Sequence, residues 1–256
     1  MLKLCIDSII ETIGDIPYEI IVSDSQTEED TEMLIREEFP QVHFFPHKEN
    51  IGFGALVNNS IAKSHGNFLF LLNADVVVKK GALEEMRTYL QEHDDVGMVG
   101  PQQQNFNGTP QSTCYRFYHP WTIIYRRTPL RYTKRGKRHL AWFLMEDYDQ
   151  LQPRRVDWMM GSALMVRKSA IDKVGPMDPR FFMYLEDVDW CRRFWDNGFS
   201  VVFLPQAKIY HYLGKGSAKN GLFRSIFSNK LTWIHISSGI KYFSKYNGKS
   251  LPHYDT

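Results

Sequence analysis

The sequence predicts an α/β fold in which helices flank a mostly parallel central sheet. Runs rich in β-branched and aromatic residues alternate with segments whose apolar residues recur at helical spacing, the pattern of a βα repeat. Polar residues follow several of the apolar runs, where strands of such a sheet would have their carboxyl ends. With 256 residues, 43% of them hydrophobic, the chain can bury one sizeable core.

The first predicted element is an amphipathic helix at residues 2–13, which Gly14 can end. A parallel α/β domain normally opens with a strand, and the helix that follows packs on the sheet of that strand. We therefore expect the sheet to lack its first strand.

Residues 18–22 predict a strand that runs into Ser23-Asp24-Ser25, and the acidic residues 28–30 then open a helix. The carboxylate and hydroxyl groups at this strand end suit hydrogen bonds to a base or a sugar. A helix N-cap, followed by acidic residues that the helix dipole favours, explains them equally well. Both interpretations stay open.

After a short predicted strand at residues 42–45, Asn50, Gly52 and Gly54 precede or begin a helix that carries Asn58. Glycines at a helix start let the backbone approach a diphosphate closely. One short Gly-x-Gly motif is also typical of a tight loop.

The sequence FLFLLNADVVV at residues 68–78 predicts the central strand of the sheet. An apolar run without helical period is typical of a strand that is buried on both faces. Its polar break at Asn73 and Asp75 falls at the carboxyl end, where a carboxylate is placed to meet a ligand or its metal ion. A simple polar turn is the alternative.

A helix at residues 81–93 and a strand at 96–99 follow, so the alternation includes at least four strands. The pattern then weakens from residue 102 to 155. Within it, residues 126–139 are strongly basic and include Pro129 and Gly136. We expect a solvated, mobile loop there, with contact to phosphate groups or a membrane surface as the alternative.

Residues 156–166 predict another strand. Gly161 inside it indicates a position where another group approaches the backbone closely. The carboxylates of Glu186, Asp187 and Asp189 follow in an apolar, aromatic segment. Buried carboxylates are costly unless they are paired, hydrogen-bonded or near a cation, and such clusters favour functional sites. Capping of a helix with pairing to nearby arginines is the alternative.

Residues 200–204 predict a closing strand, and His211 follows it as a candidate metal ligand or an ordinary polar residue. Residues 223–246 are rich in Ile, Phe, Trp and Tyr and predict one or two amphipathic helices. These helices either pack on the domain or sit in a membrane interface.

Composition excludes several classes of protein. A net charge of +2 does not suit a general nucleic-acid binder. Three widely spaced cysteines give neither a disulfide framework nor a metal-ligand pattern, which favours a reduced compartment. The first ten residues are too short an apolar stretch and too polar for a signal peptide or membrane span. We therefore predict a cytoplasmic protein.

The order of the motifs resembles the family 2 glycosyltransferases with a GT-A fold, especially bacterial rhamnosyltransferase-like members. The motifs are Glu19-Ile20-Ile21-Val22-Ser23-Asp24, Asn50-Ile51-Gly52-Phe53-Gly54 with Asn58, Leu72-Asn73-Ala74-Asp75, Gly161-Ser162-Ala163-Leu164-Met165, Phe182 to Asp189, and Pro205 followed by His211. The resemblance implies a GT-A domain at residues 1–217, followed by an amphipathic helical segment at 218–256.

The resemblance also implies a role for each motif. Asp24 would contact the nucleotide base, and Asp75 would bind Mg²⁺ or Mn²⁺ bridging the donor diphosphate. Asn73 takes the first acidic place of the family's Asp-x-Asp motif, His211 would complete the metal site, and Asp187 would be the catalytic base. The remaining donor-side residues are Asn50, Gly52, Gly54 and Asn58, and those that would support the base and the acceptor are Glu186, Asp189, Trp158 and Gly161.

By this resemblance the chain is an inverting, metal-dependent glycosyltransferase in cell-surface polysaccharide synthesis. Its partners would be a nucleotide-sugar donor and a glycan or lipid-linked acceptor, with peripheral contact to the inner face of the cell membrane and no nucleic acid. A divalent cation stabilises the leaving diphosphate, and a carboxylate takes the proton of the attacking hydroxyl.

The sequence departs from the family at two places. We expect the family's first strand to be absent or to lie upstream of these residues, and Ser23, Ser25 and Gln26 replace a Val-Asp-Asn-Ala/Gly-like run around Asp24. The alternative function is a non-catalytic module that binds nucleotide-sugars or glycans. A nucleotidyltransferase is disfavoured, because no Gly-rich loop followed by Arg occurs near the start.

Overall fold

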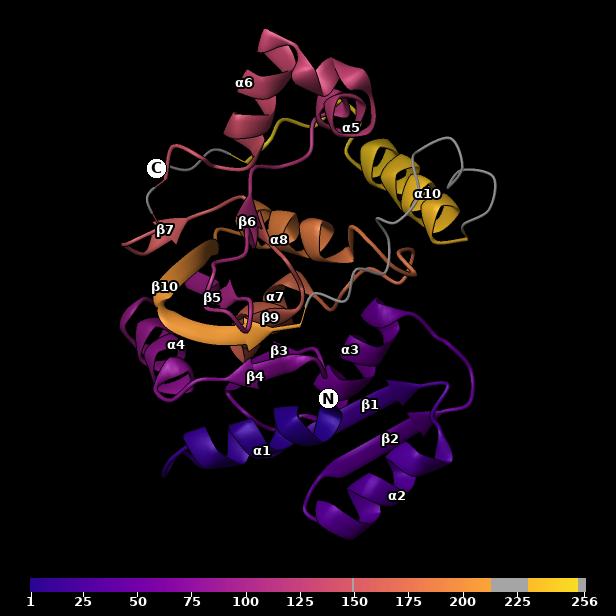
Figure 1. Cartoon of the computed structure of the whole chain (residues 1–256), viewed down its shortest axis with the longest axis vertical. Coiled ribbons are helices and arrows are strands. Elements are labelled where there is room, and N and C mark those ends of the chain that lie inside the picture. The colour runs from indigo at the N-terminus through magenta and orange to yellow at the C-terminus, as the bar shows by residue number, and fades with distance from the viewer. Residues whose placement is uncertain (149, 213–229, 253–256) are drawn as a thin grey trace.

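The computed structural model describes residues 1–148, 150–212 and 230–252, and it has the predicted α/β architecture with a central sheet flanked by helices (Figure 1). The helices are α1 (Leu2–Thr12), α2 (Glu29–Glu38), α3 (Phe53–Lys63), α4 (Ala82–Glu92), α5 (Pro120–Arg127), the 3₁₀ helix η1 (Pro129–Tyr132), α6 (Lys134–Phe143), α7 (Lys168–Val174), α8 (Glu186–Asp196) and α10 (Lys230–Lys245). The strands are β1 (Ile21–Ser25), β2 (His43–His47), β3 (Phe68–Leu72), β4 (Val76–Val78), β5 (Val96–Gln104), β6 (Cys114–Tyr115), β7 (Arg154–Arg155), β8 (Trp158–Met159), β9 (Ala163–Arg167) and β10 (Ser200–His211).

The main sheet has six strands in the order β3-β9-β5-β10-β4, with β7 also paired to β10. Among the described strands only β5 and β10 pair in parallel, because β9 enters between β3 and β5 in the opposite direction and β4 turns back against the end of β10. The expectation of a mostly parallel sheet was therefore wrong for this sheet. The two-stranded β1–β2 sheet is parallel.

The predicted central strand is an edge strand. Within the described structure β3 pairs only with β9, and four of its five residues are half-buried. In the same described residues β1 pairs only with β2, and a groove of about 930 Å³ separates β1 from β3. Apolar side chains of α1, β1, α3 and β3 line this groove.

Hydrophobic clusters cover both faces of the main sheet, and successive residues of β9 point alternately into one cluster and the other. Leu164 and Val166 belong to the cluster that α8 covers, whereas Ala163 and Met165 belong to the cluster that α4 covers. This is the period of two that a strand buried on both faces requires. The predicted helix at residues 81–93 is confirmed as α4, and its apolar residues at helical spacing, Met86 and Leu90, are fully buried.

Two sequence predictions about the middle of the chain were wrong. The basic segment expected to be a loop forms η1, α6 and the end of α5, because His119 and Thr133 cap α5 and α6 and Pro120 starts α5. The strand expected at residues 156–166 is broken at 160–162, so β8 and β9 belong to different sheets.

The helix α10 is fastened to α8 by a buried carboxylate. Asp189 is fully buried, and its Oδ1 accepts hydrogen bonds from Lys245 Nζ at 2.5 Å and from the Tyr246 hydroxyl at 2.9 Å. Its Oδ2 accepts from Arg193 Nε at 2.9 Å. The predicted boundary at residue 217 lies outside the described residues, but α10 packs on the domain.

We expect Asp189→Ala to lower the free energy of unfolding by about 3–5 kcal/mol, because it leaves the largely buried Arg193 without a carboxylate and Lys245 with that of Asp178 alone. Asp172→Ala is the matched control. It removes a mostly exposed ion pair with Lys168 and should cost no more than about 1 kcal/mol. Urea unfolding measures both changes, and equal losses would contradict the role of this buried carboxylate.

Candidate active site

A single turn between β8 and β9 holds the two parts of the candidate site together. The backbone N–H of Gly161 donates to Asp187 Oδ2 at 3.0 Å, and the carbonyl of Ser162 accepts from the N–H of Asn73 at 3.0 Å. The side chain of Ser162 is in turn hydrogen-bonded to Gln103, which is fully buried. The turn therefore joins the start of α8 to the loop that ends in Asp75.

Asp187 lies in the first turn of α8. Its Oδ1 accepts from the N–H of Val188 at 2.8 Å, so each carboxylate oxygen receives one backbone donor. Burial raises the pKa of Asp187 in spite of these donors. A Cβ at Gly161 would lie 3.4 Å from Asp187 Cβ and 3.2 Å from the ring of Phe53, so a glycine keeps this approach close.

Glu186 is the second carboxylate at this place. It is buried, and its Oε2 has no hydrogen-bond partner among the described residues. Burial, and to a lesser extent the charge of Asp187, raise the pKa of Glu186 to about 8. The two adjacent carboxyl groups therefore hold a proton at neutral pH.

The loop before α8 is strained. Tyr184 and Leu185 both have φ of 68°, in the left-handed region that side chains other than glycine rarely adopt. The helix α10 supports this loop, because the ring of His235 stacks on Tyr184 with centroids 4.6 Å apart and Ser238 donates to the carbonyl of Met183 at 2.8 Å. Strain that the surrounding structure supports in this way is common at functional sites.

On the other side of the turn, the pairing of β4 with β10 brings Asp75 to His211. His211 lies opposite Val76 in the antiparallel register, and the N–H of Tyr212 donates to the carbonyl of Asp75 at 2.9 Å. Asp75 Oδ1 lies 3.5 Å from His211 Nε2 and accepts no hydrogen bond from the described residues. Asp75 and His211, which were each expected to follow a strand, therefore face each other in the structure.

Gln111 sets the direction in which the imidazole of His211 presents its lone pair. The Nε2 of Gln111 donates to Asn105 Oδ1 at 3.0 Å and to the carbonyl of His211 at 2.9 Å, so its Oε1 is the acceptor toward His211 Nδ1 at 3.1 Å. The proton of His211 then sits on Nδ1. The lone pair on Nε2 faces Asp75 Oδ1.

A carboxylate oxygen and an imidazole lone pair that face each other suit a shared divalent cation. No group of three or more His, Cys, Asp or Glu residues that could hold a metal occurs in the described part of the chain. Asp75 and His211 are the two facing residues at this place that could hold such a cation. No sequence pattern pointed to Gln111, which is 100 residues from His211.

The predicted donor-side residues lie around the start of α3. Asp24 lies inside β1, because this strand runs to Ser25 and not to Val22 as predicted. Asn50 Oδ1 accepts from the N–H of Gly52 at 3.0 Å. A Cβ at Gly52, where φ is 84°, would lie 2.3 Å from the carbonyl oxygen of Phe182, so this glycine lets α3 contact the loop before α8.

Two further residues of the predicted site contact the protein itself. Asn58 binds the backbone of Met177 with both ends of its amide, at 2.8 Å each, which holds the segment before α8 against α3. Gly54 lies close to the same segment, 3.6 Å from the carbonyl oxygen of Phe181 if a Cβ is added. These contacts are within the protein and leave the predicted role of Asn58 and Gly54 in donor binding a prediction.

Aromatic rings lie beside the candidate base. Trp158 stacks on Tyr115 and Tyr118, with centroids 4.6 and 5.6 Å apart, and donates to the carbonyl of Arg116 at 2.8 Å. The charge of Asp187 is among the causes that raise the pKa of Tyr118, after burial, which is the largest. Trp158 itself is buried and the two tyrosines are half-buried, so only the tyrosines offer ring surface to a sugar.

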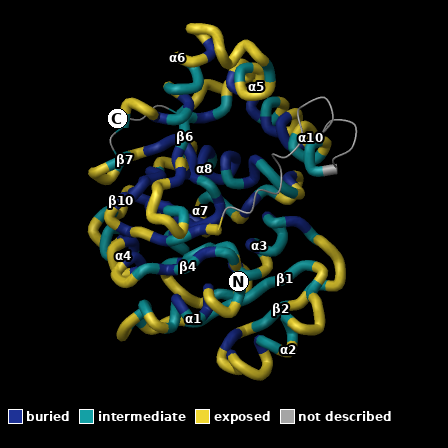
Figure 2. Tube along the Cα trace, in the orientation of Figure 1, coloured by how far each residue is buried: buried dark blue, intermediate teal, exposed yellow. Residues whose placement is uncertain are grey.

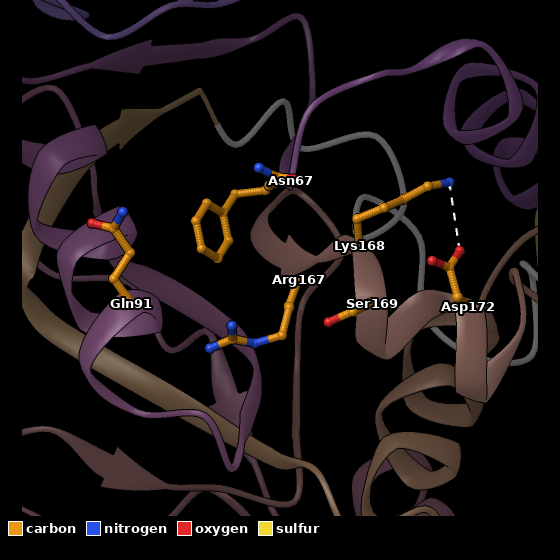
Figure 3. Close-up of a pocket in the computed structure, with 7 residues that line it drawn as sticks. Asn67, Gln91, Arg167, Lys168, Ser169 and Asp172 are labelled. Atoms are coloured by element: carbon orange, nitrogen blue, oxygen red, sulfur yellow. Dashed lines mark ion pairs between the residues drawn. The ribbon is translucent and has the colours of Figure 1, made fainter.

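A separate hollow of about 560 Å³ lies near the start of β3 (Figure 3). The guanidinium of Arg167 in its wall donates to the carbonyls of Leu90, His93 and Val96, and Lys168 pairs with Asp172. Its cations are thus already engaged by the protein. The turn between β8 and β9 therefore defines the better candidate site.

Comparisons with known proteins agree on one family. A family model described as Glycosyl transferase family 2 matches residues 1–175. The N-acetylglucosaminyl-diphospho-decaprenol L-rhamnosyltransferase of Mycobacterium tuberculosis is 23% identical over 251 residues, which cover 86% of this chain and 75% of that protein. The rhamnosyltransferase WbbL of Escherichia coli is 33% identical over 90 residues, or 35% of this chain and 31% of that protein.

Solved structures show the same fold. GalNAc-T7, crystallised with UDP, GalNAc and Mn²⁺, has a TM-score of 0.62 at 18% identity, and the match covers 97% of this chain but only 53% of that one. Residues 1–349 of TarS from S. aureus have a TM-score of 0.53 at 14% identity, covering 96% of this chain and 69% of that one.

The raised pKa of Glu186 predicts how the stability of the chain depends on pH. Between the unfolded value of 4.5 and the folded value of about 8, the folded chain holds a proton that the unfolded chain releases. This contribution is complete below the unfolded pKa and is lost as pH rises through the folded one. We expect Glu186→Gln to remove it.

Thermal unfolding between about pH 5 and pH 9 measures the effect. The fall in midpoint with rising pH should be smaller in Glu186→Gln than in the parent by about 3 °C or more, the equivalent of roughly 1 kcal/mol. The control is Glu85→Gln at an exposed position of α4, which should follow the parent. Identical pH profiles for all three chains would contradict the burial of a protonated Glu186.

Proposed function

Because the chain belongs to glycosyl transferase family 2 and is a glycosyltransferase, we propose that it transfers a sugar from a nucleoside-diphosphate donor to a hydroxyl group of a glycan or lipid-linked glycan. The observation that carries this proposal is the turn at residues 160–162, which holds Asp187 beside the loop of Asn73 and Asp75. A proton acceptor and a candidate cation site thus meet at one edge of the sheet.

Asp187 is the proposed catalytic base. Its two backbone donors fix the carboxylate, and its raised pKa brings it closer to the range in which a carboxylate accepts a proton efficiently. As the acceptor hydroxyl attacks the anomeric carbon, its proton passes to Asp187 and the bond from that carbon to the diphosphate breaks. One direct displacement inverts the configuration of the anomeric carbon.

Asp75 and His211 are the proposed ligands of Mg²⁺ or Mn²⁺. The fit rests on Asp75 Oδ1, which accepts no hydrogen bond in the described structure, and on the Nε2 lone pair that Gln111 directs toward it. When bound, the cation would stabilise the negative charge of the departing diphosphate. Mn²⁺ accompanies UDP in the related GalNAc-T7 structure.

The remaining assignments follow the same division of the site. Asp24, Asn50, Gly52, Gly54 and Asn73 would hold the nucleotide and the diphosphate, whereas Asn58 positions the segment before α8. Trp158 and its stacked tyrosines would face the acceptor. A relative is named for a decaprenol-linked substrate, so we propose a lipid-linked acceptor, cell-surface polysaccharide synthesis and action at the cytoplasmic face of the membrane.

One observation favours a second candidate function, a binding module without turnover. Asp24 lies in the β1–β2 sheet, which the groove separates from the main sheet that carries Asp75. Donor binding by the intact chain without transfer to any acceptor would support this second function.

We expect Asp187→Asn to reduce transfer by about 10²–10⁴-fold, because the amide cannot accept the proton of the acceptor. The donor is first selected by calorimetry from UDP-, GDP- and dTDP-sugars in the presence of Mn²⁺. Its affinity should then change by no more than about threefold in the variant, because the base does not contact the diphosphate. Asp172→Asn, on the exposed side of α7, is the control. Full activity of Asp187→Asn would refute the assignment.

Gln111→Leu should weaken Mn²⁺ binding by about 10–100-fold, as expected when the outer hydrogen bond of a metal-bound imidazole is removed. Electron paramagnetic resonance of Mn²⁺ with the selected nucleoside diphosphate measures this without turnover. Asp75→Ala should abolish the protein-dependent signal. Gln91→Leu, an exposed glutamine of α4, should bind like the parent. Unchanged Mn²⁺ affinity in Gln111→Leu would show that Gln111 does not orient a metal ligand.

A further inference from the structure

We propose that the chain docks on an anionic phospholipid surface through a basic cap, formed by α5, η1 and α6 together with the exposed side of α10. The inference deepens the proposed function, since it rests on a lipid-linked acceptor. Figure 1 places α5 and α6 at one end of the molecule, beside α10, and the β1–β2 sheet at the opposite end.

Charge is concentrated on the cap. Residues 119–145 contain seven Lys or Arg residues and no Asp or Glu. This segment therefore carries a formal charge of +7 in a chain whose total is +2, which leaves −5 for the remainder. None of the seven forms a salt bridge within the part of the chain that the structure describes. They are Arg126, Arg127, Arg131, Lys134, Arg135, Lys137 and Arg138.

Large apolar side chains are exposed among these charges. Trp121, Trp142 and Trp233 are all the tryptophans that are exposed, at 52%, 44% and 58%. Tyr132 is 73% exposed and Ile240 on α10 is 67% exposed. Figure 2 shows exposed positions over much of α5 and α6. Tryptophan and tyrosine rings next to basic residues are typical of a surface that sits at the level of lipid headgroups.

The helices of the cap are held to one another. Thr122 Oγ1 and His139 Nε2 lie 2.7 Å apart and connect α5 to α6. Arg127 Nη2 lies 3.3 Å from His235 Nδ1 and connects α5 to α10. Burial, with the charges of the nearby arginines, lowers the pKa of His235 to about 4, so its neutral ring can accept this hydrogen bond.

The cap is also joined to the candidate active site. His235 stacks on Tyr184, three residues before Asp187, and Arg126 donates to the Tyr118 hydroxyl at 2.7 Å. A bilayer resting on the cap would therefore lie on the acceptor side of the site. An acceptor anchored in that bilayer could present its hydroxyl to Asp187 without leaving the surface.

The composition of the cap favours lipid over nucleic acid as the partner. Phosphates of either would attract its charges, but exposed Ile and Leu side chains gain burial in a bilayer interface that a phosphate backbone does not offer. The docking proposed here is peripheral. Among the described residues no helix is both long and apolar enough to cross a bilayer.

Vesicle co-sedimentation of the whole chain tests the proposal, with phosphatidylcholine vesicles that contain about 30% phosphatidylglycerol or none, at roughly 50 and 500 mM NaCl. We expect binding to the anionic vesicles that salt weakens. Replacing Lys134, Arg135, Lys137 and Arg138 by Ala together should reduce this affinity on the order of 100-fold, since each basic residue near an anionic surface contributes several-fold.

The matched control replaces four exposed lysines outside the cap by Ala, with the same change in net charge: Lys63, Lys80, Lys173 and Lys208. It should keep its affinity for anionic vesicles within about threefold. Trp142→Ala should lower the binding that persists at high salt, which a purely electrostatic contact would not change.

Three results would overturn the proposal: no preference for anionic vesicles, an equal loss in the control, or competitive displacement from vesicles by a single-stranded oligonucleotide that binds more tightly. Vesicle binding needs neither donor nor turnover. If the parent chain binds vesicles but never transfers sugar, the proposed function is refuted. The proposal that the basic cap docks on an anionic lipid surface would still hold. Transfer to a water-soluble acceptor should survive in the variant that replaces the four residues of α6.

Discussion

The two hydrogen bonds of one turn determine how the candidate site is built. Gly161 donates to Asp187 and Ser162 accepts from Asn73, so the turn must lie between the start of α8 and the end of β3. The turn reaches this position because β9, which follows it, runs antiparallel between β3 and β5 and begins opposite the end of β3. A buried carboxylate without donors would cost several kcal/mol. The unexpected direction of β9 is thus what supplies the donor that Asp187 requires.

The C-terminal helix belongs to the same structural unit as the site. The contacts of Asp189 with Lys245 and Tyr246 fasten α10 to α8, and the stacking of His235 on Tyr184 supports the strained residues that lead into α8. Strain of this kind costs about 1–3 kcal/mol per residue and persists only where surrounding contacts compensate for it. The attachment of α10 therefore contributes to the position of Asp187 as well as to stability.

Apolar periodicity predicted helices and their buried faces, which depend on local sequence. It did not predict strand order or contacts between residues that are far apart in the chain. The buried face of α4 follows directly from its helical spacing, and family resemblance singled out Asp187, Asp75 and His211. An apolar run such as β3 does not state the direction or number of its neighbours, so its place at a sheet edge could not be read from it. The helices of the basic segment have local caps, His119 and Thr133, which a search for apolar periodicity does not register. Gln111 reaches His211 only through the fold.

Under the proposed function, there is an electrostatic reason for separating the base, Asp187, from the proposed cation ligands, Asp75 and His211. A divalent cation close to Asp187 would stabilise its ionised form and lower its pKa, which opposes the effect of burial and weakens a base. The proposed cation ligands lie instead where β4 meets β10, and the turn at residues 160–162 stands between them and α8. The leaving diphosphate and the incoming hydroxyl are at opposite sides of the anomeric carbon in a direct displacement. A site divided by a turn can therefore stabilise negative charge on one side and accept a proton on the other.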